Sequence, residues 1–247
     1  MTRFLLAGFL LLSCTFNSLG QTYTYASDSL AIARLGYTDT TIQFNPHLAV
    51  RFNFVPAEIA LPTLENHGLK FQRDALNPNF QNRFFAQHPG LDIDVQDRQV
   101  RVGNVVIPHP GRNWYPSSRI DTSYEQIDVM RIRWGWDEGG GFGLVKYLTG
   151  QSVFMYGEPH LSPKGNFVVA VNCDLDAGYT PTGFEFYSVF EDFIDKHPAY
   201  STLNWGPVDF VWQFDTRGYA LCKMIDPTTE HWDELYFFLL LTIDRTP

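Results

Sequence analysis

Three oxygen-bearing side chains, Asn172, Asp174 and Asp176, alternate along the chain shortly before Gly178. Side chains two residues apart in an extended segment point to the same side. Because calcium prefers amide and carboxylate oxygens, this spacing predicts a calcium loop, and calcium is the one cofactor we expect. The pattern departs from an EF-hand because Ala177 intervenes before the glycine and the closing glutamate is missing. The alternative is a turn whose carboxylates accept hydrogen bonds from its own backbone.

A second candidate site consists of Trp134 and Trp136, which share one face of a predicted strand, and of Asp137 and Glu138, which follow them. Exposed tryptophan rings would stack on sugars or other flat ligands. A glycosidase requires two carboxylates that face each other, and Asp137 or Glu138 opposite Asp174 or Asp176 would supply such a pair. The alternative is that both rings fill a β core, where aromatic residues are favoured.

Other catalytic patterns are missing from the sequence. The seven histidines lack zinc-site spacing, and no Gly-x-Ser-x-Gly elbow is present. Residues 139–143 are glycine-rich, but no helix is predicted after them, so a loop or bulge is expected there and not a phosphate-binding turn. We therefore assign no catalytic residue.

The first twenty residues resemble an export signal. Arg3 precedes an apolar run over residues 4–12, and Ser18 and Gly20 supply the small residues expected before a cut ahead of Gln21. This is the layout of a secretory signal peptide, and the run is too short to span a bilayer. We expect residues 1–20 to be removed and the protein to be periplasmic or extracellular.

A second cleavage site competes with the first. Residues 11–14 (LLSC) resemble a bacterial lipobox, which would make Cys14 the lipidated first residue of an outer-membrane lipoprotein. A buried N-terminal helix is the remaining alternative.

The other two cysteines, Cys173 and Cys222, form an even pair in a chain cut after residue 20. An oxidising compartment favours a disulfide between them. The alternative is two buried free thiols, which pack as small apolar side chains.

The charge balance narrows the range of partners. The chain has 27 acidic against 18 basic residues, whereas nucleic-acid binding requires a basic surface. An anionic membrane surface is disfavoured for the same reason. The longest later apolar run, residues 235–243, is too short for a transmembrane helix and is typical of a buried strand.

The elements that would position these residues are mostly strands. Two β-branched runs flank Gly103 and Asn104, which predicts a hairpin because glycine supplies the positive φ of a type II′ turn. After residue 127 the chain alternates short apolar runs with glycine and proline turns, which indicates an all-β domain. The predicted strands cover residues 129–136, 142–147, 152–156, 166–172, 184–189, 209–214, 219–224 and 235–243.

The preceding part of the chain is less regular. One or two strands are predicted over residues 41–54. Residues 55–97 contain four prolines and are predicted to be mostly loop, with a helical turn near 79–86. One further short helix is predicted over 190–197, before Pro198. We therefore divide the chain into a signal peptide (1–20), a loop-rich region packing on the β domain (21–97) and the β domain itself (98–247).

Two segments, residues 157–171 and 206–221, share the order glycine, proline, apolar piece, glycine turn and apolar strand. Their spacing is close to the blade period of β-propellers. The first turn resembles the SPDG turn of TolB-type and WD40-type propellers, and it consists of Ser162, Pro163, Lys164 and Gly165. The string DLDAGY at residues 174–179 is similar to one in uncharacterised exported bacterial proteins. This resemblance implies a fold and export, and no catalytic residue.

The sequence thus predicts a mainly β, antiparallel meander with few short helices. It is propeller-like but too short for a closed ring, so a partial propeller or a sandwich is expected. We expect a non-catalytic binding module that contacts a protein or glycan of the cell envelope or exterior. The alternatives are a secreted hydrolase that acts on glycans through surface carboxylates, and a calcium-stabilised adhesion-type domain.

Overall fold

In the computed structural model, the described residues are 25, 39–71, 77, 79–110, 116–136, 139–225 and 234–245. They form a mainly β structure of antiparallel sheets, as the sequence predicts. The predicted signal peptide, with Cys14, lies outside the described residues. Within the described part of the chain, no helix combines the length and the apolarity needed to cross a membrane.

Strands from both ends of the described chain meet in one five-stranded sheet, which we call the terminal sheet. Its order is β1-β2-β17-β16-β15, so β17 pairs with β2 on one side and with β16 on the other. The helix α2 (Ala57–Asn66) packs Ala60 and Leu64 against one face of this sheet. The strands are β1 (Thr40–Asn45), β2 (Leu48–Val55), β15 (Trp205–Phe214), β16 (Arg217–Ile225) and β17 (Glu234–Arg245).

The second sheet, the β10–β14 sheet, packs against the other face of the terminal sheet. Alternate residues of each strand point into the space between the sheets, as the period of two requires. Phe52 of β2, Phe184 of β12 and Cys222 of β16 belong to this shared core. The strands are β10 (Glu158–Leu161), β11 (Phe167–Asn172), β12 (Gly183–Val189), β13 (Ile194–Lys196) and β14 (Tyr200–Ser201).

The β6–β9 sheet is buried on both faces. Leu144 and Met155 pack against the β10–β14 sheet, whereas Ile132 and Trp134 pack against the β3–β5 sheet and the helix α3 (Phe80–Gln87). The strands of the two sheets are β3 (Ile93–Gln96), β4 (Gln99–Val102), β5 (Val105–Pro108), β6 (Ser117–Tyr124), β7 (Val129–Trp136), β8 (Gly139–Lys146) and β9 (Ser152–Met155). A 3-10 turn, η1 (Glu125–Ile127), joins β6 to β7.

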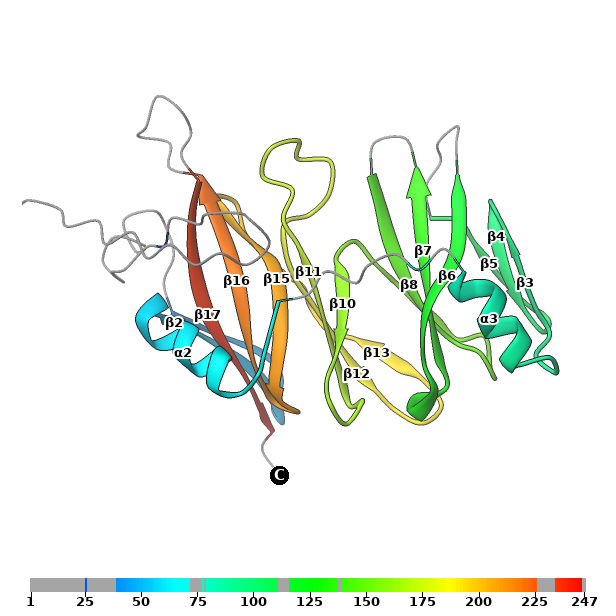
Figure 1. The fold of residues 1–247 in the computed structure, drawn as a ribbon, viewed down its shortest axis with the longest axis horizontal. Coiled ribbons are helices and arrows are strands. Elements are labelled where there is room, and N and C mark those ends of the chain that lie inside the picture. The colour runs from blue at the N-terminus through cyan, green and yellow to red at the C-terminus, as the bar shows by residue number, and fades with distance from the viewer. Residues whose placement is uncertain are drawn as a thin grey trace, which may run out of the picture.

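The four sheets therefore stack face to face as consecutive layers, with α2 beyond one end (Figure 1). Three of the layers follow one another in chain order as antiparallel meanders. Among the described residues, no sheet closes into a barrel and the stack does not close into a ring. The predicted open meander is confirmed.

The N-terminal region is more integrated into the sheets than the sequence predicts. The boundary at 97/98 falls inside the β3–β4 hairpin, and β1 and β2 belong to the terminal sheet. The helix near 79–86 is confirmed by α3, but α2 was not expected because Pro62 lies inside it. The helix predicted over 190–197 is wrong, because β13 pairs there with β12.

The predicted hairpin around Gly103 is confirmed, with Gly103 at a φ of 56°. By contrast, residues 139–141 were expected to form a loop or bulge, yet they begin β8 and pair with β7. Glycine fits there because added side chains would collide with neighbours. A Cβ on Gly141 would lie 2.6 Å from the Phe154 ring, and one on Gly140 would lie 2.8 Å from the Trp134 carbonyl oxygen.

The two repeated segments are adjacent hairpins whose turns are joined by Asp215. One carboxylate oxygen of Asp215 accepts a hydrogen bond from the backbone N–H of Lys164 at 3.0 Å, and the other accepts one from Asn166 Nδ2 at 2.9 Å. The Lys164 turn connects β10 to β11, and Asp215 lies in the turn between β15 and β16. Asp215 thereby links the β10–β14 sheet to the terminal sheet.

Because of this link, the free energy of unfolding depends on pH. Burial raises the pKa of Asp215, but hydrogen bonds from Asn166, Ser162 and Lys164 outweigh it and hold the pKa below its ordinary value. A lowered pKa in the folded state stabilises the fold above the ordinary carboxyl pKa, and this contribution is lost as pH falls through the lowered value. We expect Asp215→Asn to lower the free energy of unfolding by about 1–3 kcal/mol at neutral pH.

Urea unfolding of both proteins across acidic and neutral pH measures the effect, and the difference between them should shrink as pH falls. Asp97→Asn is the matched control, because Asp97 is an exposed residue of the β3–β4 turn. An Asp215→Asn deficit that does not change with pH would contradict the assignment.

Candidate functional site

The predicted tryptophan platform is not exposed. Trp134 is 2 % exposed and packs in the core between the β6–β9 and β3–β5 sheets. Trp136 is half-buried beside the rings of His109 and Phe154. These positions fit the alternative, in which the rings fill the core. Asp137 and Glu138, the carboxylates predicted beside them, lie outside the described residues.

The predicted calcium ligands point to different partners. Asp174 accepts hydrogen bonds from the backbone N–H groups of Gly178 at 3.1 Å and Thr180 at 2.7 Å, and from the Thr180 hydroxyl at 3.0 Å. Asn172 uses its Nδ2 for Thr180 and the Pro181 carbonyl oxygen. Asp176, whose side chain is 75 % exposed, lies 3.5 Å from Lys223 Nζ.

Asp174 thus closes its own loop, which is the alternative to a calcium site. Although burial raises the pKa of Asp174, the hydrogen bonds from Thr180 and Gly178 bring it below its ordinary value. In the part of the chain that the structure describes, no cluster of three or more His, Cys, Asp or Glu side chains has the geometry to hold a metal ion.

The predicted disulfide is not formed in this structure. Cys222 is fully buried in the core between the terminal and β10–β14 sheets, and Cys173 is half-buried; both are free thiols. Burial raises the pKa of Cys173 to about 11, so both thiols are protonated at neutral pH.

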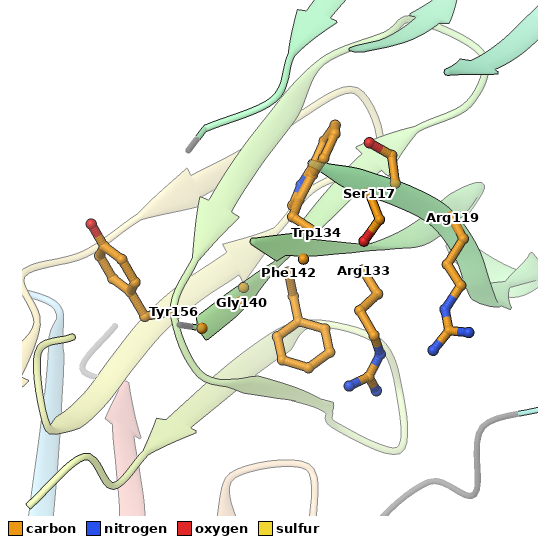
Figure 2. A pocket seen from close by; sticks show the side chains of 11 residues that line it. Ser117, Arg119, Arg133, Trp134, Gly140, Phe142 and Tyr156 are labelled. Carbon is orange, nitrogen blue, oxygen red and sulfur yellow. The ribbon is translucent and has the colours of Figure 1, made fainter. Parts of the chain in front are cut away.

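A pocket that the sequence did not indicate opens on the β6–β9 sheet, and we call it the arginine pocket (Figure 2). Its volume is about 580 Å³. The side chains of Arg119 and Arg133 extend side by side from neighbouring strands, with the Phe142 ring next to Arg133 and Tyr156 across the opening. The lining residues are Ser117, Ser118, Arg119, Arg133, Trp134, Gly135, Gly139, Gly140, Gly141, Phe142 and Tyr156.

Strand register brings these residues together. Arg119 of β6 is the partner of Arg133 of β7, and Arg133 is the partner of Phe142 of β8. Directly opposed residues of antiparallel strands project to the same face, so the three side chains form one row. Two residues further along each strand, the next row on this face consists of Ser117, Gly135 and Gly140. The two glycines of this row leave space above the sheet.

A buried ion-pair network positions Arg133. Asp121, whose side chain is 3 % exposed, accepts hydrogen bonds from Nε of Arg131 at 2.7 Å and from Nε of Arg133 at 2.9 Å. Arg131 is 2 % exposed, and its Nη1 lies 3.6 Å from Glu158 on the facing sheet. The Phe142 ring lies against both guanidinium groups, 4.6 Å from that of Arg133.

Arg119 differs from Arg133 because it has no ion-pair partner among the described residues, although it is half-buried. Figure 2 shows its guanidinium group pointing in the same direction as that of Arg133. Two adjacent guanidinium groups repel each other, and a bound anion relieves that repulsion. With the Ser117 hydroxyl on the same face, the pocket is suited to bind an anionic group. None of the lining residues that the structure describes is a carboxylate.

A sequence signal for this pocket did exist. Arg131 and Arg133 occupy alternate positions of a strand that was predicted with correct bounds. Charges inside an otherwise apolar strand must be paired or face an opening. The sequence did not show, however, that Arg119 would be their cross-strand neighbour, because that depends on the register of β6.

Comparisons with protein-family models, with curated proteins and with solved structures give no match for this chain.

The loop around Asp174 generates a test. We expect Asp174→Ala to lower the free energy of unfolding by about 1–3 kcal/mol, because the hydrogen bonds from the Gly178 and Thr180 N–H groups to a charged acceptor are lost. Asp176→Ala, in the same loop but exposed, should change it by no more than about 0.5 kcal/mol. Thermal unfolding followed by circular dichroism measures both.

Thermal unfolding also tests whether the Asp174 loop binds calcium. Excess calcium should leave the melting temperature of the wild type unchanged relative to a chelator. An increase with calcium that both Asp174→Ala and Asp176→Ala abolish would restore the calcium loop and contradict the self-capping assignment.

Proposed function

We propose that this protein is a non-catalytic binding module of the cell envelope or exterior, and that the arginine pocket holds an anionic ligand. The observation that carries the proposal is the pairing of Arg119 and Arg133 in one pocket of a chain whose formal net charge is −9. In such an acidic protein, two guanidinium groups directed at one opening need a specific reason.

The surroundings of the two arginines support binding in preference to catalysis. Asp121 fixes Arg133 through Nε, so the guanidinium plane is held before a ligand arrives. A positioned guanidinium group loses less conformational entropy on binding a carboxylate than a flexible one. The described lining residues offer no acid–base pair, which a glycan hydrolase would require.

The remaining lining groups favour an acidic saccharide as the ligand. A uronate carboxylate suits the arginines, and a sugar hydroxyl group suits Ser117, which lies on the same face of the sheet as the arginines. Tyr156, which is 38 % exposed at the rim, offers a ring face for a sugar to stack against. A glycan of the envelope or exterior is therefore the partner that we propose.

We expect calorimetric titration to show that a galacturonate trimer binds, that an uncharged galactose trimer does not, and that Arg119→Gln weakens the affinity roughly tenfold or more. The basis is the loss of a charge-assisted hydrogen bond, which contributes about 1.5–3 kcal/mol. Binding should also weaken as salt concentration rises.

Arg217→Gln is the control, because it removes the same charge from an exposed position of the terminal sheet. Binding that is equal for both trimers, absent for both, or insensitive to Arg119→Gln would overturn the proposal. Arg133 is a poorer choice for this test because its loss would also disturb the buried Asp121 pair.

The proposed location has its own test. Cleavage after Gly20 should yield an exported protein that begins at Gln21, which N-terminal sequencing after expression in a Gram-negative host would reveal. A Cys14→Ser variant should be processed identically. Processing at Cys14, with lipid attached, would support the lipoprotein alternative, and uncleaved protein in the cytoplasm would contradict export.

A further inference from the structure

A carboxylate of a different sheet lies next to the rim of the arginine pocket. Glu185 of β12 shares a face with Tyr187, which packs in the core between the β10–β14 and β6–β9 sheets. The side chain of Glu185 is 13 % exposed. Glu185 therefore faces the sheet that carries the pocket.

Glu185 binds the chain where β9 ends. Its Oε2 accepts a hydrogen bond from the backbone N–H of Tyr156 at 2.8 Å. The Tyr187 hydroxyl lies 3.1 Å from both Glu185 Oε1 and the Phe154 carbonyl oxygen, so it can donate to either acceptor. Two neighbouring side chains of β12 thus contact the backbone on both sides of Met155.

A cation balances the charge of Glu185. Lys196 Nζ of β13 donates a hydrogen bond to Glu185 Oε1 at 2.9 Å, and it lies 5.6 Å from the centre of the Tyr187 ring. Because its charge is paired and it does not line the pocket, Glu185 adds little repulsion against an anionic ligand. Its other oxygen, Oε2, accepts the Tyr156 N–H.

Tyr156 lies in the short turn between β9 and β10, and this turn is held closely. Its ring meets the Phe154 ring edge to face, with the ring centres 5.1 Å apart. A Cβ on the next residue, Gly157, would collide with the backbone of Val171 on β11. The turn is therefore pressed against the β10–β14 sheet, and Glu185 adds a charged hydrogen bond from the same sheet.

We propose that Glu185 is a positioning residue that fixes Tyr156 at the rim, so that the tyrosine ring forms a wall against which a sugar stacks. This inference rests on the proposed binding of an acidic saccharide. The two arginines come from the β6–β9 sheet, whereas the wall across the opening is held by the β10–β14 sheet (Figure 2). A ring that is already fixed loses little conformational entropy when a ligand binds.

Amide hydrogen exchange in the ligand-free full chain tests the positioning by itself. Glu185→Ala should speed exchange at the Tyr156 N–H roughly tenfold or more, because the acceptor of this group is lost. Lys196→Gln is the matched control, because it removes the ion pair and leaves Glu185 Oε2 in place. Its exchange rate at Tyr156 should match that of the wild type. An unchanged rate in Glu185→Ala would overturn the positioning role, whatever the ligand.

Calorimetric titration with the galacturonate trimer tests the consequence for binding. Tyr156→Ala and Glu185→Ala should each weaken the affinity roughly three- to tenfold, as expected for the loss of one aromatic contact. The double variant should be no weaker than Tyr156→Ala, because both changes remove the same contact. Glu185→Gln should restore the wild-type affinity, since its amide oxygen also accepts the Tyr156 N–H. Thermal unfolding confirms that each variant is folded.

The two measurements separate the two proposals. A wild type that does not bind the trimer would overturn the proposed function, and with it the role of Glu185 in binding, even where exchange at Tyr156 responds as expected. If the wild type binds but Glu185→Ala keeps the full affinity, the positioning role is wrong and the proposed function stands. The same holds if the losses from Glu185→Ala and Tyr156→Ala add in the double variant.

Discussion

A buried carboxylate between two arginines determines how the middle of this molecule is built. Asp121 is buried and accepts hydrogen bonds from Arg131 and Arg133. The Asp121 carboxylate can therefore be buried only if both arginines lie beside it. Removing one partner from such a group typically costs about 3–5 kcal/mol, because an uncompensated charge is left inside. This requirement fixes β6 against β7.

The register set by the Asp121 pair also places Arg119 beside Arg133. The register thereby brings two guanidinium groups to one opening. Glycines complete the opening: Gly135 and Gly140 leave the sheet bare where side chains would otherwise fill it. Strand pairing and one buried ion pair thus explain where the pocket lies, and Arg119 adds the second cation.

Most of the fold was predictable from the sequence because strands with a period of two and glycine turns are local signals. The bounds of β7 and the hairpin at Gly103 are examples. The helix predicted over 190–197 failed because pairing with β12 outweighed a weak periodicity. The arginine pocket could not be predicted, since it arises from register between strands. The Asp174 loop was recognised as polar, but its sequence could not distinguish a metal site from a self-capped turn.

The position of β17 has a consequence for how the protein matures. β17 lies between β2 and β16, so β2 acquires one of its two neighbours only after residues 234–245 have emerged from the ribosome. Until then, Phe52 of β2 can pack against Phe184 and Phe186 of β12 but lacks its neighbours on β17. Contacts between such distant segments form slowly, because a long loop must close first. The terminal sheet is therefore completed last, after the three sheets whose strands are neighbours in sequence.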